Sequence, residues 1–311
     1  MISKPMDVLE AFPIRKSKMQ KQAFRDAVQS YLKTISYEAA IEKGSLGARN
    51  IVIGNPETAK YLVTAHYDTP AVLPFPNLIT PCNFWPFLGY QILITLLIFA
   101  MALVPGLLLA LAGISADIAV RTWSISLYAL LVLMLFGPAN KHNANDNTSG
   151  VVSVLEIAKS MPENYRDQVC FVLFDLEEAG LIGSASYQKA HKKHTANQLV
   201  LNMDCVGDGN EIMMFPTKKL LQNAEKMDQL RKITGSWGEK SIAIREKGFA
   251  YYPSDQKNFP YGVGIAAFNR SSWAGLYCSR IHTKKDTVLE ETNVNILRAA
   301  IVSLITCGAV K

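Results

Sequence analysis

The sequence has few cysteines and little charge, and each shortage excludes a class of protein. Only five of the 311 residues are cysteine and no two of them form a CxxC pair, so we expect reduced core thiols rather than a disulfide framework. Charged residues make up 19% of the chain, the net charge is only +6, and no arginine-rich segment is interleaved with aromatic residues. We therefore expect no nucleic-acid partner. The hydrophobic share of 49% excludes a disordered chain, because it offers ample apolar surface to bury.

Charge is missing altogether from one long part of the chain. No Asp, Glu, Lys, Arg or His occurs in residues 69–116, and residues 122–140 are again free of charge. The first stretch contains an almost unbroken apolar run over 85–112, and the second contains another over 124–137. A helix needs about 20 apolar residues to cross a hydrocarbon core of about 30 Å. We predict a transmembrane helical hairpin inserted at residues 83–138 that contacts a lipid bilayer, with a buried hairpin of a soluble protein as the alternative.

Outside this segment, strands alternate with helices. Short apolar runs bounded by turn residues predict strands, and longer amphipathic stretches predict helices. The expected strands cover 50–54, 61–65, 168–173 and 198–203, and the expected helices cover 17–32, 151–161, 181–194, 220–234 and 293–307. This alternation predicts an α/β fold, a three-layer mixed β-sheet with helices on both faces. It is built from residues 1–82 and 139–311, with the hairpin of residues 83–138 inserted between them.

Five short polar stretches stand out, and four of them follow a predicted strand or open a predicted helix. The five stretches are His66–Asp68, Asn145–Asn147, Asp175–Glu178, Asn202–Asp204 and Ile281–Thr283. In open α/β sheets, ligands bind at the carboxyl ends of strands. Taken singly, an aspartate in such a place is more often a helix cap, and two adjacent glutamates suit the first turn of a helix. Imidazole and carboxylate together, however, are the ligand set of zinc in hydrolytic sites.

In their order along the chain and in their short sequence motifs, these stretches resemble the co-catalytic zinc aminopeptidases, the bacterial leucyl aminopeptidase family. That family includes glutaminyl cyclases and relatives of glutamate carboxypeptidase, and it has a zinc-exopeptidase fold. The resemblance is carried by AHYDTP (65–70), NANDNTSG (143–150), FDLEEAGLIGS (174–184), NMDCVG (202–207) and HTKKDT (282–287). It covers the chain on both sides of the predicted hairpin.

The resemblance implies the metal ligands residue by residue. His66 and Asp204 would bind one zinc ion, Glu178 and His282 would bind the other, and Asp146 would bridge the two. A shared carboxylate is physically reasonable, because two cations about 3.5–4 Å apart repel each other. The resemblance therefore implies two Zn²⁺ ions per chain, or one if the protein works as a cyclase does.

The resemblance also implies two residues that act beside the metals. Glu177 would be the general base that takes a proton from the metal-activated water and passes it to the leaving amine. Asp68 would accept a hydrogen bond from the second ring nitrogen of His66 and so fix the tautomer of that histidine. One departure from the family is Asn147, where many relatives carry a second acidic residue.

The function we expect on this basis is that of a membrane-anchored zinc aminopeptidase, which removes N-terminal residues from peptides. The hairpin lies between His66 and Asp146, where soluble relatives have a much shorter loop, so we expect hydrophobic or membrane-proximal substrates. The alternatives are a glutaminyl-cyclase-like or N-acyl amino acid amidase activity on the same scaffold, or a non-catalytic membrane protein that binds a ligand. Because residues 1–25 lack the apolar stretch of a signal peptide, we expect a protein of the cell membrane whose catalytic domain is cytoplasmic.

Overall fold

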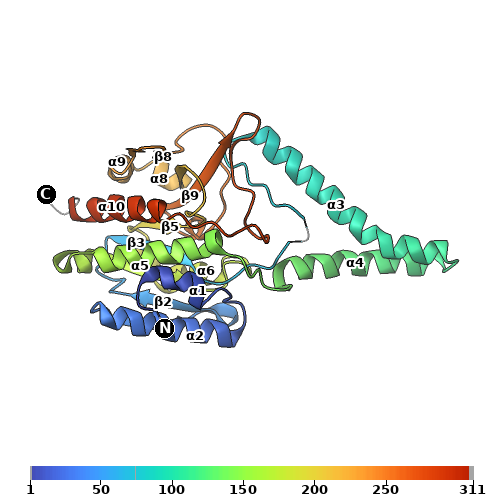
Figure 1. Ribbon diagram of the computed structural model, residues 1–311, viewed down its shortest axis with the longest axis horizontal. Coiled ribbons are helices and arrows are strands. Elements are labelled where there is room, and N and C mark those ends of the chain that lie inside the picture. Colours follow the sequence, from blue (N-terminus) through green and yellow to red (C-terminus); the bar gives the residue numbers. More distant parts are fainter. Residues whose placement is uncertain (1, 74, 308–311) are drawn as a thin grey trace.

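The core of the molecule is a ten-stranded mixed β-sheet, seen in a computed structural model that describes residues 2–73 and 75–307 (Figure 1). The strand order is β1-β2-β4-β3-β5-β9-β6-β8-β7, with β10 paired to β9. The strands are β1 (Ala39–Lys43), β2 (Arg49–Ile53), β3 (Tyr61–His66), β4 (Val169–Phe174), β5 (Leu199–Met203), β6 (Glu211–Pro216), β7 (Gly235–Trp237), β8 (Lys240–Ile244), β9 (Gly262–Ser271) and β10 (Gly275–Tyr277). The predicted α/β fold with a mixed sheet is confirmed.

The central strands are buried on both sides, which explains their nearly continuous apolar sequences. Along β4, Phe171 and Leu173 belong to one hydrophobic cluster, whereas Val172 and Phe174 belong to the cluster on the other face. Strand β3 runs parallel to both β4 and β5. The carboxyl ends of these three strands therefore meet at one edge of the sheet.

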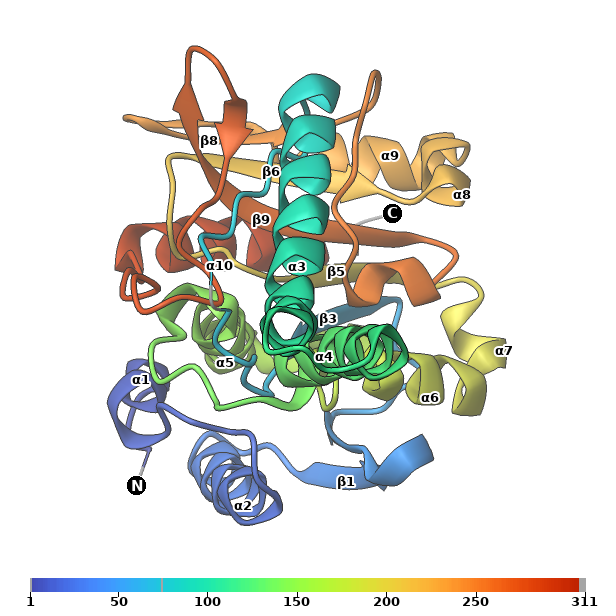
Figure 2. The same cartoon turned by 90° about the vertical axis from the view of Figure 1, so that its right-hand side faces the viewer.

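Helices cover both faces of the sheet, as Figure 2 shows. The helices are α1 (Val8–Ala11), α2 (Lys18–Thr34), α3 (Phe84–Leu111), α4 (Ala116–Phe136), α5 (Gly150–Ser160), α6 (Ile182–Ala190), α7 (Lys192–Thr195), α8 (Lys218–Leu221), α9 (Ala224–Arg231) and α10 (Glu291–Cys307). Helices α2, α5 and α10 contribute to the larger hydrophobic cluster on one face, and α6 contributes Tyr187 to the cluster on the opposite face.

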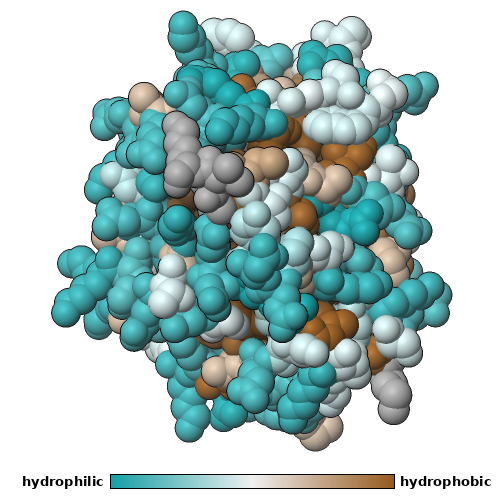
Figure 3. Space-filling model, turned by 90° about the vertical axis from the view of Figure 1, so that its left-hand side faces the viewer, coloured by the Kyte–Doolittle hydropathy of each residue, from teal (hydrophilic) through white to brown (hydrophobic). Residues whose placement is uncertain are grey.

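Two helices, α3 and α4, project from the sheet domain as a hairpin (Figure 1). Both are long and apolar enough to cross a membrane. In an apolar 18-residue window of each helix, only 11% of the residues are buried in α3 and 0% in α4. They approach closely where Gly106 meets Ala119, because a Cβ at Gly106 would lie 2.5 Å from the Ala119 carbonyl oxygen. Small residues at such a crossing are typical of helices that pack in a bilayer. The face of the molecule away from the hairpin is mostly hydrophilic (Figure 3).

The structure corrects two predictions made from the sequence. The helix expected over 220–234 is two short helices, α8 and α9, because the Asn223 side chain accepts a hydrogen bond from the Lys226 backbone N–H (3.0 Å) and starts a new helix. Of the five thiols expected in the core, Cys307 is exposed and Cys82 is half-buried, since they lie at the end of α10 and in the loop before α3.

Candidate metal centre and active site

Four of the predicted site residues lie at the shared carboxyl edge of β3, β4 and β5. His66 is the last residue of β3, Glu177 and Glu178 follow β4 after a short turn, and Asp204 is the first residue after β5. The two remaining predicted ligands, Asp146 and His282, come from loops that fold over this edge. The parallel pairing of the three strands thus brings together side chains that are far apart in the sequence.

Asp146 lies between the two histidines. Its Oδ1 is 3.2 Å from Nε2 of His66, and its Oδ2 is 2.9 Å from Nε2 of His282. Beyond this carboxylate, Asp204 Oδ1 is 3.7 Å from the same nitrogen of His66, and Glu178 Oε2 is 3.7 Å from that of His282. One carboxylate with an oxygen directed to each histidine is the arrangement that a bridging ligand requires.

The five predicted ligands form two overlapping groups whose donor atoms lie within 4.8 Å of one another. One group is His66, Asp146 and Asp204, and the other is Asp146, Glu178 and His282. Glu177 lies as close, since it forms a third group with His66 and Glu178. The distances therefore group these six residues into one candidate site, but they do not distinguish Glu177, the predicted base, from the predicted ligands.

The chemistry of this cluster fits divalent cations. One polar atom inside it, Oε1 of Glu178, is buried without a hydrogen-bond partner among the described residues. Four buried or half-buried carboxyl groups face only two imidazoles, so acidic groups outnumber basic groups in the cluster. Such a group of buried carboxylates is costly unless cations offset the charge.

The pKa values of Glu177 and Glu178 are shifted in the opposite direction to the pKa of Asp146. Burial raises the pKa of Glu177 well above its ordinary value, with the charge of Glu178 adding to the effect. Burial likewise raises the pKa of Glu178, with the charge of Asp146 adding to it. For Asp146, burial acts in the same direction, but hydrogen bonds with His282 and His66 outweigh it and hold its pKa well below the usual range.

Both histidines hold a proton more strongly than usual in the metal-free protein. Burial lowers the pKa of His66, but the charge of Glu177 and the contact with Asp146 outweigh burial and raise it well above its ordinary value. For His282, burial also acts downward, and the hydrogen bond with Asp146 reverses the direction. Cations that bind here must therefore displace protons.

Asp68 contacts more than the histidine for which it was predicted. Its Oδ1 lies 3.5 Å from Nδ1 of His66, which is longer than an ordinary hydrogen bond. The two carboxylate oxygens also accept hydrogen bonds from the backbone N–H groups of Glu177 (3.0 Å) and Glu178 (3.2 Å). Asp68 therefore ties the end of β3 to the turn that carries both glutamates.

Asp286 is a residue of the site whose role the sequence did not reveal. Its two carboxylate oxygens accept hydrogen bonds from the backbone N–H groups of Asn145 (2.7 Å) and Asp146 (3.1 Å). Burial raises the pKa of Asp286 to about 7, and the nearby Asp146 charge acts in the same direction. Asp286 belongs to the HTKKDT segment, but only the tertiary structure brings it to the loop that it holds.

The hydrogen bonds of the Asn147 side chain explain why an amide, and not a carboxylate, occupies this position. Its Nδ2 donates to the Met203 carbonyl oxygen (3.0 Å), and its Oδ1 accepts from the backbone N–H of Gly150 (3.0 Å) and of Cys205 (3.2 Å). A carboxylate could not make the donated bond. The backbones pack tightly here, because a Cβ at Gly150 would lie 2.4 Å from the same carbonyl oxygen.

A cleft of about 300 Å³ opens onto these residues. Its wall includes three residues from the start of α3, namely Phe87, Tyr90 and Gln91. Tyr252 also lines the cleft and donates a hydrogen bond to the Asp204 carbonyl oxygen (3.0 Å). The hairpin thus forms part of the cleft as well as projecting from the domain.

A mixed α/β sheet with carboxylates and imidazoles at its carboxyl edge defines a metallohydrolase-like site. A sequence profile of peptidase family M28 matches residues 130–304, more than half of the chain. The chain therefore belongs to peptidase family M28, which agrees with the resemblance seen in its motifs.

Solved structures with the same fold have low sequence identity. Two structures of the LapA aminopeptidase of Legionella pneumophila match at TM-scores of 0.57 and 0.59 with 13% and 14% identity. These matches cover 97% and 99% of this chain, which spans 66% and 72% of the length of those chains. The glutaminyl cyclase of Macrostomum lignano matches at a TM-score of 0.52 with 14% identity, over 98% of this chain and 89% of that chain. No curated protein matches the chain in sequence.

Proposed function

We propose that the chain is a membrane-anchored zinc aminopeptidase. The observation that carries the proposal is the position of Asp146, whose two oxygens face His66 (3.2 Å) and His282 (2.9 Å) from opposite sides. On this proposal His66, Asp146 and Asp204 hold one zinc ion, and Asp146, Glu178 and His282 hold the second. Zinc at these positions would supply Lewis acidity, which polarises a scissile carbonyl group and lowers the pKa of water.

The proton transfers belong to Glu177. The side chain is in the cleft and within reach of His66 and Glu178, while its backbone is fixed by Asp68. A carboxylate whose pKa is raised is a stronger base than an ordinary glutamate, which suits a group that first accepts a proton from water and then donates it to the leaving amine. Asp68 acts as a positioning residue, since it contacts His66 and both glutamate backbones.

The substrates that suit this cleft are apolar. The Phe87 ring from α3 packs against Tyr251, with ring centroids 5.1 Å apart, and Tyr90 donates a hydrogen bond to the Pro76 carbonyl oxygen (2.6 Å). Further along α3, Ile98 and Met101 line an apolar cavity of about 310 Å³ between the two hairpin helices. A cleft walled by a membrane helix favours peptides that are hydrophobic or lie close to the bilayer.

Hydrolysis of leucine p-nitroanilide by the full chain in detergent tests the activity. We expect hydrolysis that is lost on chelation and restored by zinc, with about two zinc ions per chain. An inactive protein with both metal positions filled would contradict the proposal. A peptide with N-terminal glutamine tests the cyclase alternative, which predicts cyclisation and one zinc ion.

A second pair of variants tests the substrate preference. Phe87→Ala removes an aromatic ring from the cleft, whereas Leu93→Ala removes a side chain of the same helix that is 61% exposed. We expect the first substitution to lower kcat/KM about tenfold for substrates with large apolar residues and little for alanine substrates, because about 1–3 kcal/mol of apolar contact is lost. We expect Leu93→Ala to leave both values unchanged.

A further inference from the structure

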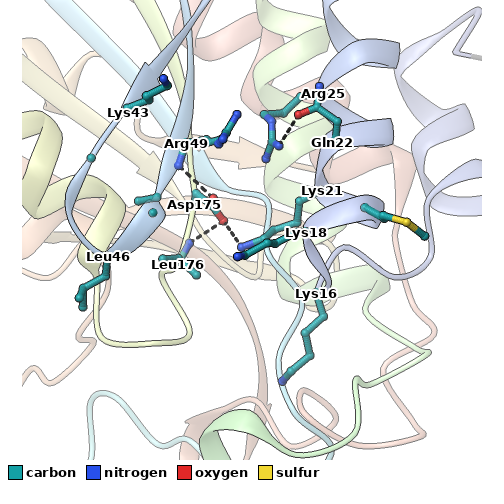
Figure 4. A pocket seen from close by; sticks show the side chains of 14 residues that line it. Lys16, Lys18, Lys21, Gln22, Arg25, Lys43, Leu46, Arg49, Asp175 and Leu176 are labelled. Atoms are coloured by element: carbon teal, nitrogen blue, oxygen red, sulfur yellow. Dashed lines mark hydrogen bonds and ion pairs between the residues drawn. The ribbon is translucent and has the colours of Figure 1, made fainter.

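A second cavity lies outside the catalytic cleft, in a groove between α2 and strands β1 and β2. It has a volume of about 690 Å³, more than twice that of the cleft. Figure 2 shows α2 and β1 side by side at one end of the sheet, and Figure 4 shows the groove from close by. We call it the basic groove, because its lining includes six cationic side chains: Lys16, Lys18, Lys21, Arg25, Lys43 and Arg49.

A single carboxylate, Asp175, faces these cations, and its hydrogen-bonding capacity is used within the protein. It accepts hydrogen bonds from Nζ of Lys21 (2.7 Å), from the backbone N–H of Arg49 (3.0 Å) and from the backbone N–H of Leu176 (3.0 Å). The charge of Lys21 is therefore paired, and little negative charge is left for the other five cations.

The remaining cations have no anionic partner among the described residues. The side chains of Lys18, Lys43 and Arg49 make no hydrogen bond or ion pair with any residue in 2–73 or 75–307, the part of the chain that is described. Arg25 is only 4% exposed, yet its guanidinium donates to neutral groups, the Tyr67 hydroxyl (2.8 Å) and the Gln22 amide oxygen (2.8 Å). A buried guanidinium without a counter-charge is costly, and an anion in the groove would reduce that cost.

The rim of the groove lies at one end of the hairpin. Nζ of Lys16 donates a hydrogen bond to the Leu135 carbonyl oxygen (3.3 Å), in the last turn of α4. If α4 crosses a bilayer as proposed above, this turn lies at the level of the lipid headgroups. Lysine and arginine clusters next to a membrane helix attract anionic lipids on the cytoplasmic side.

We propose that the basic groove binds a phosphate group, supplied either by an anionic phospholipid or by a free phosphate compound. Phosphate suits the groove because lysine and guanidinium donors bind its oxygens with charge-assisted hydrogen bonds. The groove itself does not depend on the proposed function, but the preference for a phospholipid rests on the proposed membrane hairpin.

Two cations of the groove bind residues that lie close to predicted site residues in the sequence. Tyr67, which Arg25 holds through its hydroxyl, lies between His66 and Asp68 in the chain. Asp175, which Lys21 holds, precedes Glu177 by two residues.

Calorimetric titration of the full chain in a neutral detergent tests the proposal with three probes: inorganic phosphate, dioctanoyl phosphatidic acid and dioctanoyl phosphatidylcholine. The test variant is Lys18→Glu with Arg49→Glu, two exposed positions. The matched control is Lys192→Glu with Lys232→Glu, which changes the net charge equally at exposed positions outside the groove. Hydrolysis of leucine p-nitroanilide is followed in the same preparations, so a failure of the proposed peptidase activity is seen separately.

We expect phosphatidic acid to bind, phosphatidylcholine not to bind, and the groove variant to raise the Kd at least tenfold while the control changes it less than threefold. Inorganic phosphate that binds at least tenfold more weakly than phosphatidic acid identifies the phospholipid as the source, and equal affinity identifies a free phosphate compound. Absence of binding by both phosphate probes would overturn the proposal. An equal loss of binding in both double variants would also overturn it, because only net charge would then be sensed.

Discussion

Replacement of Glu177 by glutamine isolates the proposed proton transfer from metal binding. Glutamine has nearly the same shape, and the hydrogen bond from the backbone of residue 177 to Asp68 does not involve the side chain. The substitution therefore removes only the ability to accept and release a proton. A general base contributes about 10²- to 10⁴-fold to a rate. We expect kcat for leucine p-nitroanilide to fall by this factor, which corresponds to about 3–5 kcal/mol of transition-state stabilisation.

The adjacent residue provides a matched control. Glu178 is as near to the cluster and carries a pKa raised by the same cause, burial. Glu178→Gln should remove a ligand and reduce the zinc content by about one ion per chain, whereas Glu177→Gln should retain both ions. Zinc content by plasma emission spectrometry, kcat and the thermal midpoint are measured on both variants.

Two results would refute this reasoning. If Glu177→Gln keeps more than a tenth of the wild-type rate, another group is the base. If it loses as much zinc as Glu178→Gln does, then the two glutamates have been assigned the wrong way round, which their similar distances from His66 would permit.

Two further predictions concern metal binding. Asp286→Ala should lower both the thermal midpoint and the zinc affinity, because two buried backbone N–H groups lose their hydrogen-bond acceptor at a cost of about 1–3 kcal/mol each. Asp286→Asn should restore part of the loss. Unchanged zinc affinity in the alanine variant would contradict the prediction, since the loop would then keep its shape without the carboxylate. Zinc affinity should fall as the pH falls, because His66, His282 and Glu178 have raised pKa values in the metal-free protein and hold protons that zinc must displace. Calorimetry of zinc binding at pH 7 in two buffers of different ionisation enthalpy should detect more than one proton released per chain. If no proton is released, the predicted direction of the pH dependence is wrong.

Local patterns predicted the elements that carry the site. The strands that end at His66, Phe174 and Met203 are short, apolar and buried on both faces, so their sequences indicate strands without any tertiary information. The apolar hairpin is evident for the same reason, since 28 consecutive helical residues in α3 carry no charge. The strands and the hairpin are predictable because each is recognised from the composition of its own segment alone.

Features that depend on tertiary contacts were not predictable. Strand β9 contains GVGIAAFN, whose glycines and alanines have low strand propensity, yet it pairs with both β5 and β6 at the centre of the sheet. The bonds from the backbone of residues 145 and 146 to Asp286 join segments about 140 residues apart. The basic groove likewise combines cations from residues 16–25 with others from residues 43–49.

The point of insertion explains how a long hairpin can lie between two predicted metal ligands without separating them. Its two ends are joined, because Ala71 and Ala139 form an antiparallel bridge and the backbone N–H of Val72 donates to the Pro138 carbonyl oxygen (2.9 Å). The chain therefore leaves the domain and returns to it at one place, and His66 and Asp146 stay in contact. At that same place α3 supplies Phe87 and Tyr90 to the cleft wall. Changes in the hairpin sequence can accordingly alter substrate preference while the metal ligands remain where the sheet holds them.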